Sequence, residues 1–177
     1  DTVDTVWVDD RWSNKFRFTG TARMADLLEV LAALEASGRI SVGRRWQIYL
    51  QLRAENARII PLSAEEILHH LRSARIVDGI IVESAALRTL REYAAALLAD
   101  ASWLRVPPSS QLAIGETGEL EVVRSYASAV RGALIGLWQA AKSEPDRANL
   151  IEVRAKSAWL VGNLYVDLAV LRSLAIT

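Results

Sequence analysis

Apolar and polar residues alternate in two stretches of the chain that predict short strands. From Val3 to Val8, apolar residues stand around Asp4 and Thr5, which is typical of a strand near 3–8 that ends at Asp9–Asp10. A second strand is predicted near 58–61, within the run 57–62. Pro61 closes it because proline has no N–H to donate to a ladder. Asp78–Gly79 predicts a turn, and residues 80–82 either a brief extended segment or the approach to a helix.

Helical spacing, with apolar residues three and four positions apart, dominates the rest of the chain. Gly38 is a typical stop after the first helix, and Ser41 can cap the second. In the sequence Ser63-Ala64-Glu65-Glu66 we expect a capping box, in which the Glu66 carboxylate reaches back to the Ser63 amide. The predicted helices cover residues 21–37, the stretch after Ser41, 63–74, 85–100, 119–142 and 146–174. The chain is therefore expected to be α/β and helix-rich, with an all-helical part after residue 75.

Composition shifts suggest four segments. These are an α/β part over 1–75, a helical continuation over 76–106, a linker over 107–118 and a two-helix extension over 119–177. The linker contains Pro107-Pro108-Ser109-Ser110. Because the chain opens on Asp1 and its single methionine is Met24, we expect it to be a piece of a longer polypeptide.

Charge and cysteine content exclude several classes of function. Twenty-one Lys and Arg balance twenty-one Asp and Glu, so a broad basic footprint for nucleic acid is absent, although a local patch remains open. The chain has no cysteine, which excludes disulfides and cysteine nucleophiles. No apolar run reaches the ~18 residues that span a bilayer, and no signal peptide is recognisable. We therefore expect a cytoplasmic protein that does not enter a membrane.

Asp9 and Asp10 are the sharpest candidates for chemistry. Adjacent carboxylates after a strand lie at the carboxyl edge of a sheet, where ligands of open α/β sheets bind, and hard divalent cations need such oxygen ligands. The alternative is a turn or a helix cap, since Asp commonly follows strands in that role. Spacing alone favours this structural role.

Three further groups invite a ligand interpretation. Adjacent helical residues point about 100° apart, so His69 and His70 are not expected to share one ion; we expect one semi-buried and one solvated ring. Trp12 could stack on a base of single-stranded nucleic acid. Basic side chains could bind phosphate, with a solvated surface as the alternative: Lys15, Arg17, Arg39, Arg44, Arg45 and Arg53.

The order of features over residues 3–75 resembles the C-terminal half of PIN-like nuclease domains. It is most similar to the large bacterial versions that continue into a helical tail within multidomain conflict or defence proteins. The resemblance rests on these segments: Val8-Asp9-Asp10-Arg11, Gly20-Thr21, 25–31, Gly38-Arg39-Ile40-Ser41, 50–53, 58–62 and 63–68. Residues 80–108 and 159–167 also fit this version.

The resemblance implies a partial three-layer α/β/α sandwich followed by an all-helical C-terminal extension. It also implies a ribonuclease, part of a larger toxin or effector, in which Mg²⁺ or Mn²⁺ activates water for phosphodiester cleavage. Asp9 and Asp10 match the late acidic motif, and Asn14 lies where an additional ligand is sometimes found. Arg11, Trp12 and Lys15 would then contact single-stranded or structured RNA. The family's first acidic strand and acidic helix would precede residue 1.

Two other functions compete with the nuclease. In the first, the two long helices after residue 118 form a non-catalytic module that docks a partner or another domain of the parent polypeptide, with a homo-oligomer left open. In the second, residues 38–52 form a DNA-binding helix-turn-helix. The zero net charge and the apolar second helix argue against it.

Overall fold

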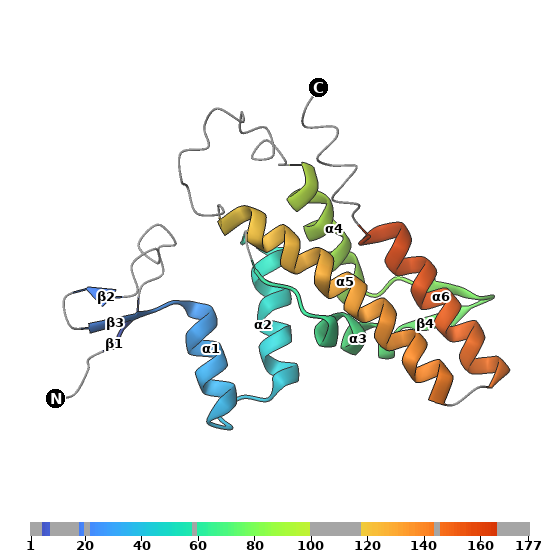
Figure 1. The fold of residues 1–177 in the computed structure, drawn as a ribbon, viewed down its shortest axis with the longest axis horizontal. Coiled ribbons are helices and arrows are strands. Elements are labelled where there is room, and N and C mark those ends of the chain that lie inside the picture. The colour runs from blue at the N-terminus through green and yellow to red at the C-terminus, as the bar shows by residue number, and fades with distance from the viewer. Residues whose placement is uncertain are drawn as a thin grey trace. The chain divides into compact units, whose positions relative to one another are not determined.

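A computed structural model describes residues 5–7, 18–19, 22–57, 60–99, 118–143 and 146–165. These residues form six helices and two small sheets (Figure 1). The expectation of a helix-rich chain with a minor share of strands is confirmed. The chain divides into two compact units, residues 1–49 and residues 50–177, which are described in turn.

A three-stranded sheet opens the first unit. Its strands are β1 (Thr5–Trp7), β2 (Phe18–Thr19) and β3 (Ala22–Ala25), in the order β1-β3-β2. β1 runs parallel to β3, with Trp7 beside Ala25, and β2 runs antiparallel to β3. The strand predicted near 3–8 is thus confirmed over 5–7.

The helix predicted from residue 21 begins later than expected. Residues 22–25 are strand because they pair on both sides with β1 and β2. Helix α1 (Leu27–Ala36) starts after Asp26, whose Oδ1 accepts a hydrogen bond from the Glu29 N–H at 2.7 Å. A short acidic side chain that satisfies a free N–H of the first turn is a strong start signal. The Asp26 cap therefore sets the start of the helix, although the apolar spacing extends further back to Met24.

The predicted end of α1 and the start of the next helix are confirmed. Gly38 has a φ of 70°, a left-handed conformation that glycine adopts without steric cost, and its N–H donates to the Glu35 carbonyl at 2.8 Å. Ser41 Oγ accepts from the Arg44 N–H at 3.2 Å and starts α2 (Val42–Ala54).

Helices dominate the second unit. After the end of α2 come α3 (Ala64–Arg72), β4 (Arg75–Val77), β5 (Ile80–Val82), α4 (Ala85–Ala99), α5 (Gly118–Ser143) and α6 (Arg147–Asn163). α5 packs against both α3 and α6, and α6 also packs against β5 (Figure 1). The largest fully buried side chains of this unit are Tyr126, Ile67, Leu71, Leu87, Leu90, Leu160, Leu164, Glu66 and Val130.

Two glycines allow the close approach of α5 to α3. A Cβ on Gly132 would lie 3.1 Å from the Cβ of Ala64, and a Cβ on Gly136 would lie 3.0 Å from Cδ1 of Leu68. Both distances are shorter than the 3.5–4.0 Å at which carbon atoms pack favourably. The Gly-x-x-x-Gly spacing places both residues on the same side of α5.

The strand predicted near 58–61 is wrong for residues 60 and 61, which belong to no strand; residues 58 and 59 lie outside the described part. The backbone carbonyls here are bound by side chains instead of a ladder. The Tyr93 hydroxyl donates to the Ile60 carbonyl at 2.9 Å, and Arg53 Nη2 donates to the Pro61 carbonyl at 2.6 Å. Ile60 and Leu62 are buried, so their apolar character reflects packing.

The expectation that the chain is all-helical after residue 75 is wrong at 75–82, where β4 and β5 form an antiparallel hairpin. The predicted turn and the extended segment after it are confirmed. Asp78 and Gly79 both have positive φ, 51° and 75°, as a two-residue hairpin turn requires. β4 was missed because three residues without a clear alternation, directly after a helix, carry almost no strand signal.

Both long C-terminal helices are confirmed, but α6 ends at Asn163, earlier than the predicted 174. The Leu164 and Tyr165 amides both donate to the Leu160 carbonyl, which closes the helix end. Residues 100–117, which include most of the predicted linker, and residues 166–177 lie outside the described part. None of the helices in the described ranges combines the length and apolar character needed to cross a bilayer.

Candidate functional site

All six residues predicted to form the nuclease site lie outside the described part of the chain. Asp9, Asp10, Arg11, Trp12, Asn14 and Lys15 fall between β1 and β2, in residues 8–17. The structure therefore does not test whether these six side chains lie close together. The described neighbourhood consists of the strands that flank them in sequence.

Within the described ranges, no three His, Asp or Glu side chains come together as a potential metal site. The two adjacent histidines behave as predicted. His70 is buried and His69 exposed, with their rings edge to face at 5.2 Å between centroids.

A buried ionic cluster in the second unit is the most organised polar arrangement of the described residues. The guanidinium of Arg53, at the end of α2, donates to both carboxylate oxygens of Glu66 on α3, at 2.5 and 3.1 Å. Both side chains are almost completely buried. Two charges withdrawn from water are tolerated only when geometry and hydrogen bonds compensate for desolvation, as this two-point pair does.

Tyr93 on α4 completes this cluster. The Arg53 guanidinium lies over its ring, 5.3 Å from the centroid, while its hydroxyl holds the Ile60 carbonyl. The Ser63 half of the predicted capping box is present, since the Glu66 N–H donates to Ser63 Oγ at 3.1 Å. The Glu66 carboxylate is committed to Arg53. The cluster thus ties the end of α2 to the first turn of α3.

His70 lies one turn after Glu66, with its Nε2 3.9 Å from Glu66 Oε1. This Nε2 is buried and lacks a hydrogen-bond partner within the described residues. Burial, with the nearby His69 and Arg53, lowers the pKa of His70 from 6.5 to about 4. A ring that stays neutral at physiological pH suits a core position beside a cation.

Two of the arginines considered for phosphate binding are committed elsewhere. Arg53 belongs to the buried cluster, so its proposed role as a phosphate ligand is wrong. Arg45 Nε pairs with Glu35 of α1 at 2.8 Å, and its guanidinium lies over Tyr49. Arg44 is exposed and contacts Gln47 of the same helix. The solvated-surface alternative fits Arg44 best.

A second polar contact braces the hairpin end against α4. Glu83 accepts two hydrogen bonds from Arg91, at 2.8 and 3.1 Å. These bonds hold the pKa of Glu83 below its ordinary value. The cap of α4 comes from Ser84, whose Oγ accepts the Leu87 N–H. This pair is partly exposed.

The outer side of α6 is the clearest candidate for recognition. Apolar or small residues recur there and are exposed. We call these residues, together with Tyr165 just after the end of the helix, the α6 face: Leu150, Ile151, Ala158, Val161, Gly162 and Tyr165. The four large members are between 38% and 54% exposed. The opposite side of the helix is also apolar and buried, through Val153, Leu160 and the following Leu164. α6 is apolar on both sides, but the second unit buries only one of them, so the other apolar side stays exposed.

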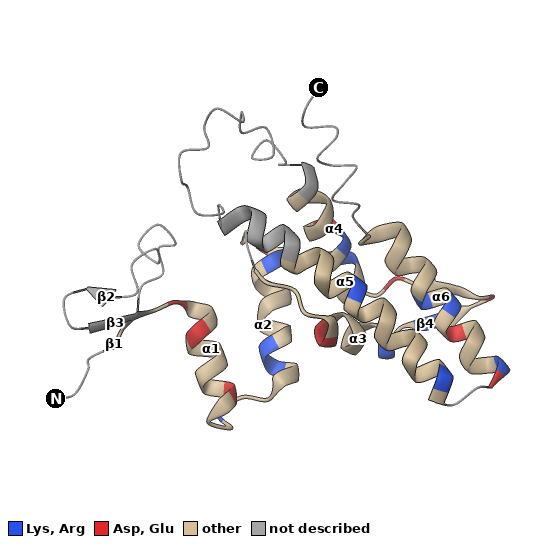
Figure 2. Ribbon diagram, in the orientation of Figure 1, with Lys and Arg blue, Asp and Glu red and all other residues tan. Residues whose placement is uncertain are grey.

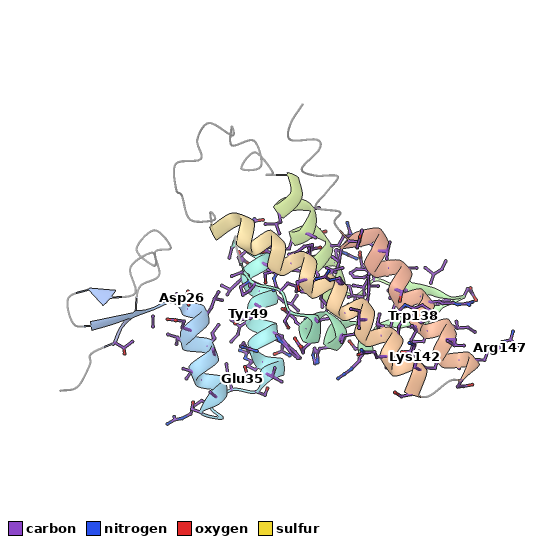
Figure 3. All side chains as sticks on the ribbon, in the orientation of Figure 1. Asp26, Glu35, Tyr49, Trp138, Lys142 and Arg147 are labelled. Carbon is purple, nitrogen blue, oxygen red and sulfur yellow. The ribbon has the colours of Figure 1, made fainter. Side chains whose placement is uncertain are left out.

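Basic residues occur along α6, where they are drawn in blue (Figure 2). Arg147 and Arg154 are exposed on the same side of α6. The one acid within α6, Glu152, is already paired with Lys156. On α5, Lys142 and the exposed Trp138 lie toward the end that leads to Arg147 (Figure 3). The surface is therefore apolar and basic.

The sequence contained a signal for the α6 face that was not used. The apolar residues of α6 lie on two sides of the helix and not on one. No protein family matches the chain, and neither the curated proteins nor the solved structures include one that is significantly similar to it.

Proposed function

We propose that the helical second unit is a non-catalytic protein-interaction module that docks a partner, or another domain of its parent polypeptide, through the α6 face. The observation that carries this proposal is the row of exposed large apolar side chains on a helix whose other side is already packed. Contiguous exposed apolar surface on a folded unit commonly marks an interaction site.

Energetics support an occupant for this face. Each large side chain gains about 1.5–3 kcal/mol when it moves from full exposure to full burial. Leu150, Ile151, Val161 and Tyr165 are each roughly half-exposed, so a partner could still cover much of their apolar surface. Arg147 and Arg154 would contribute orientation more than affinity, as charges at the rim of interfaces generally do.

Site-specific photo-crosslinking in the intact parent polypeptide tests the docking role. A photoreactive amino acid replaces Val161 in one variant and Arg88 in the control variant. Arg88 is exposed on α4, on a different helix of the same unit. We expect a discrete crosslinked product from position 161 and none from position 88. Absence of a product at 161, or equal products at both positions, would contradict the module.

A second proposal concerns the parent polypeptide: a cytoplasmic PIN-like ribonuclease that uses Mg²⁺ or Mn²⁺, with Asp9 and Asp10 as ligands. One observation favours it. β1 and β3 are parallel, so the chain leaves both strands at the same edge of the sheet, and Asp26 directly follows β3. In sequence, Asp9 and Asp10 follow β1 by two and three residues. Parallel strands of α/β folds carry their ligands at this edge.

The variant Asp9→Asn distinguishes a role of Asp9 as a metal ligand from a role as a helix or turn cap. In the intact polypeptide, we expect it to abolish Mn²⁺-dependent cleavage of single-stranded RNA and to leave the melting temperature unchanged. Unaltered cleavage would refute the ligand role. A loss of stability of about 0.5–2 kcal/mol would identify Asp9 as a cap instead.

A further inference from the structure

Two arginines stand within the apolar row on the outer side of α6. Arg147 and Arg154 are exposed and lie one turn before and one turn after the exposed Ile151, so all three share one side of the helix. Successive helical residues are about 100° apart, which places Glu152 roughly 140° from Arg147 and roughly 160° from Arg154. Glu152 is also paired with Lys156. Among the described residues, neither arginine has an acidic partner.

A partner that covers the apolar residues of this side must also come close to both charges. Ile151 is a helical neighbour of Arg147 and of Arg154, and Ala158 is a further neighbour of Arg154. Contact with Ile151 and Val161 thus removes part of the water around the two guanidinium groups. A charge that loses water without gaining an opposite charge is strongly unfavourable. The occupant therefore has to present carboxylates beside Arg147 and Arg154.

We propose that the occupant of the α6 face is an acidic amphipathic helix of a separate protein, with an apolar stripe and two Asp or Glu residues seven positions apart. This inference rests on the docking role proposed above and names the chemistry of the partner. Opposite charges accelerate the encounter of separate molecules, a gain that a domain tethered to the same chain does not need. Burial of the apolar side chains then supplies the affinity, while the charges select the partner.

Spacing favours a helix over an extended strand. Arg147 and Arg154 start from positions about 10.5 Å apart along the axis of α6, at about 1.5 Å per residue. Residues seven positions apart on a partner helix have the same spacing and lie on the same side of it. Same-side residues of a strand are about 6.6 Å or about 13.2 Å apart, at about 3.3 Å per residue. A strand that matches one arginine therefore misses the other by roughly 3–4 Å.

Two other anionic surfaces fit the α6 face less well. Nucleic acid is held by many phosphate contacts and by bases that stack on aromatic rings, whereas the large members of the face are mostly aliphatic and Tyr165 is its aromatic residue. Helices that bind anionic membranes commonly carry about four to eight cations at the membrane surface. The exposed cations of α6 are Arg147 and Arg154. A protein helix needs no more than this pair.

The photo-crosslinked product from position 161, described above, identifies the partner. Mass spectrometry of the crosslinked peptide should show a segment of a separate protein that has a helical apolar repeat and two acids seven residues apart. A synthetic peptide of that segment should bind the full chain in a titration followed by fluorescence anisotropy. Its affinity should fall about fivefold or more between about 0.1 and 1 M salt, because the Debye length shrinks from about 10 Å to about 3 Å.

Charge exchange between the chain and this peptide tests the pairing. The double variant Arg147→Glu/Arg154→Glu should bind the peptide about tenfold more weakly or worse, because carboxylates then face carboxylates. A peptide in which lysine replaces both acids should recover binding to this variant. Arg147→Lys/Arg154→Lys keeps both charges and should bind within about threefold of the wild type. Arg72→Glu is the matched control, since Arg72 is exposed on α3, outside the α6 face, and its reversal should change nothing. Circular dichroism confirms that each variant is folded.

The outcomes separate this inference from the docking role. Equal binding of the peptide by the wild type and by Arg147→Glu/Arg154→Glu would overturn the acidic helix. A crosslinked segment without the two acids, or one from the parent polypeptide or from a second copy of this chain, would overturn it as well. In each of these cases a protein still crosslinks at position 161, so the docking role stands. A product that ribonuclease removes, or a product that contains lipid, would overturn both, as would the absence of any product.

Discussion

Replacement of Gly132 by alanine probes the closest helix contact of the second unit. The new methyl group would lie 3.1 Å from the Cβ of Ala64, which is fixed to the backbone of α3 and cannot rotate away. Carbon atoms pack at about 3.5–4.0 Å, so α3 and α5 would have to separate by several tenths of an ångström. Overpacking of this kind costs roughly 1–3 kcal/mol.

Helix propensity acts in the opposite direction. Alanine in place of glycine inside a helix gains up to about 1 kcal/mol, so we expect Gly132→Ala to reduce the free energy of unfolding by roughly 0–2 kcal/mol. Gly136→Ala should be milder, because its nearest neighbour is the flexible end of the Leu68 side chain. Gly162→Ala is the control. It lies within α6 with nothing near its Cβ position, and should stabilise by a few tenths of a kcal/mol to about 1 kcal/mol.

Urea denaturation of the three variants and the wild type measures these differences. A double-mutant cycle identifies the cause, because Ala64→Gly removes the atom that Gly132→Ala would meet. We expect a favourable coupling of at least about 0.5 kcal/mol between these two substitutions and none between Ala64→Gly and Gly162→Ala. If Gly132→Ala stabilises the protein as much as Gly162→Ala does, the close approach of α3 and α5 is wrong.

Two further predictions concern the buried cluster. Between pH 6.5 and about 4 the unfolded chain protonates His70 while the folded protein does not, so acidification over this window should destabilise the fold by up to about 3 kcal/mol. Thermal melts at stepped pH should show His70→Gln losing less stability than the wild type over the same window; parallel curves would contradict a buried neutral ring. Glu66→Gln leaves the Arg53 charge buried without its carboxylate and should cost about 3–5 kcal/mol, whereas joint replacement of Arg53 by Met and Glu66 by Leu should cost less. A double variant less stable than Glu66→Gln would show that the pair itself contributes net stability.

Local signals explain which parts of the fold were predictable from the sequence. Ser41 and Ser63 start helices where their side chains suggested, and Gly38 and Asp78–Gly79 bend the chain where left-handed backbone is needed. These features depend on residues within a few positions of each other. The segment 57–62 failed because its partners are distant in sequence, eight residues away for Arg53 and 33 for Tyr93.

The candidate site was predicted less well than the fold, for a related reason. Arg53 is one of several arginines in the sequence, and only the tertiary structure of the second unit shows that it is a buried partner of Glu66. The α6 face required knowledge of which side of the helix the rest of the unit covers, since apolar spacing alone assigns both sides to a core. Asp9 and Asp10, which follow β1, lie outside the described residues, so their role as metal ligands stays a prediction.

The side-chain bonds at Ile60 and Pro61 also bear on the order of folding. A β-ladder with a strand close in sequence could form early in folding. Here the Ile60 carbonyl is instead bound by Tyr93 on α4, 33 residues away in sequence. The Ile60 carbonyl can gain this partner only after α4 has docked, which places the contact late on the folding pathway. A contact between residues far apart in sequence first loses chain entropy when the loop between them closes, and it stabilises the fold only afterwards. Amide hydrogens around this connection should therefore gain protection after those of the β4–β5 hairpin and of the individual helices.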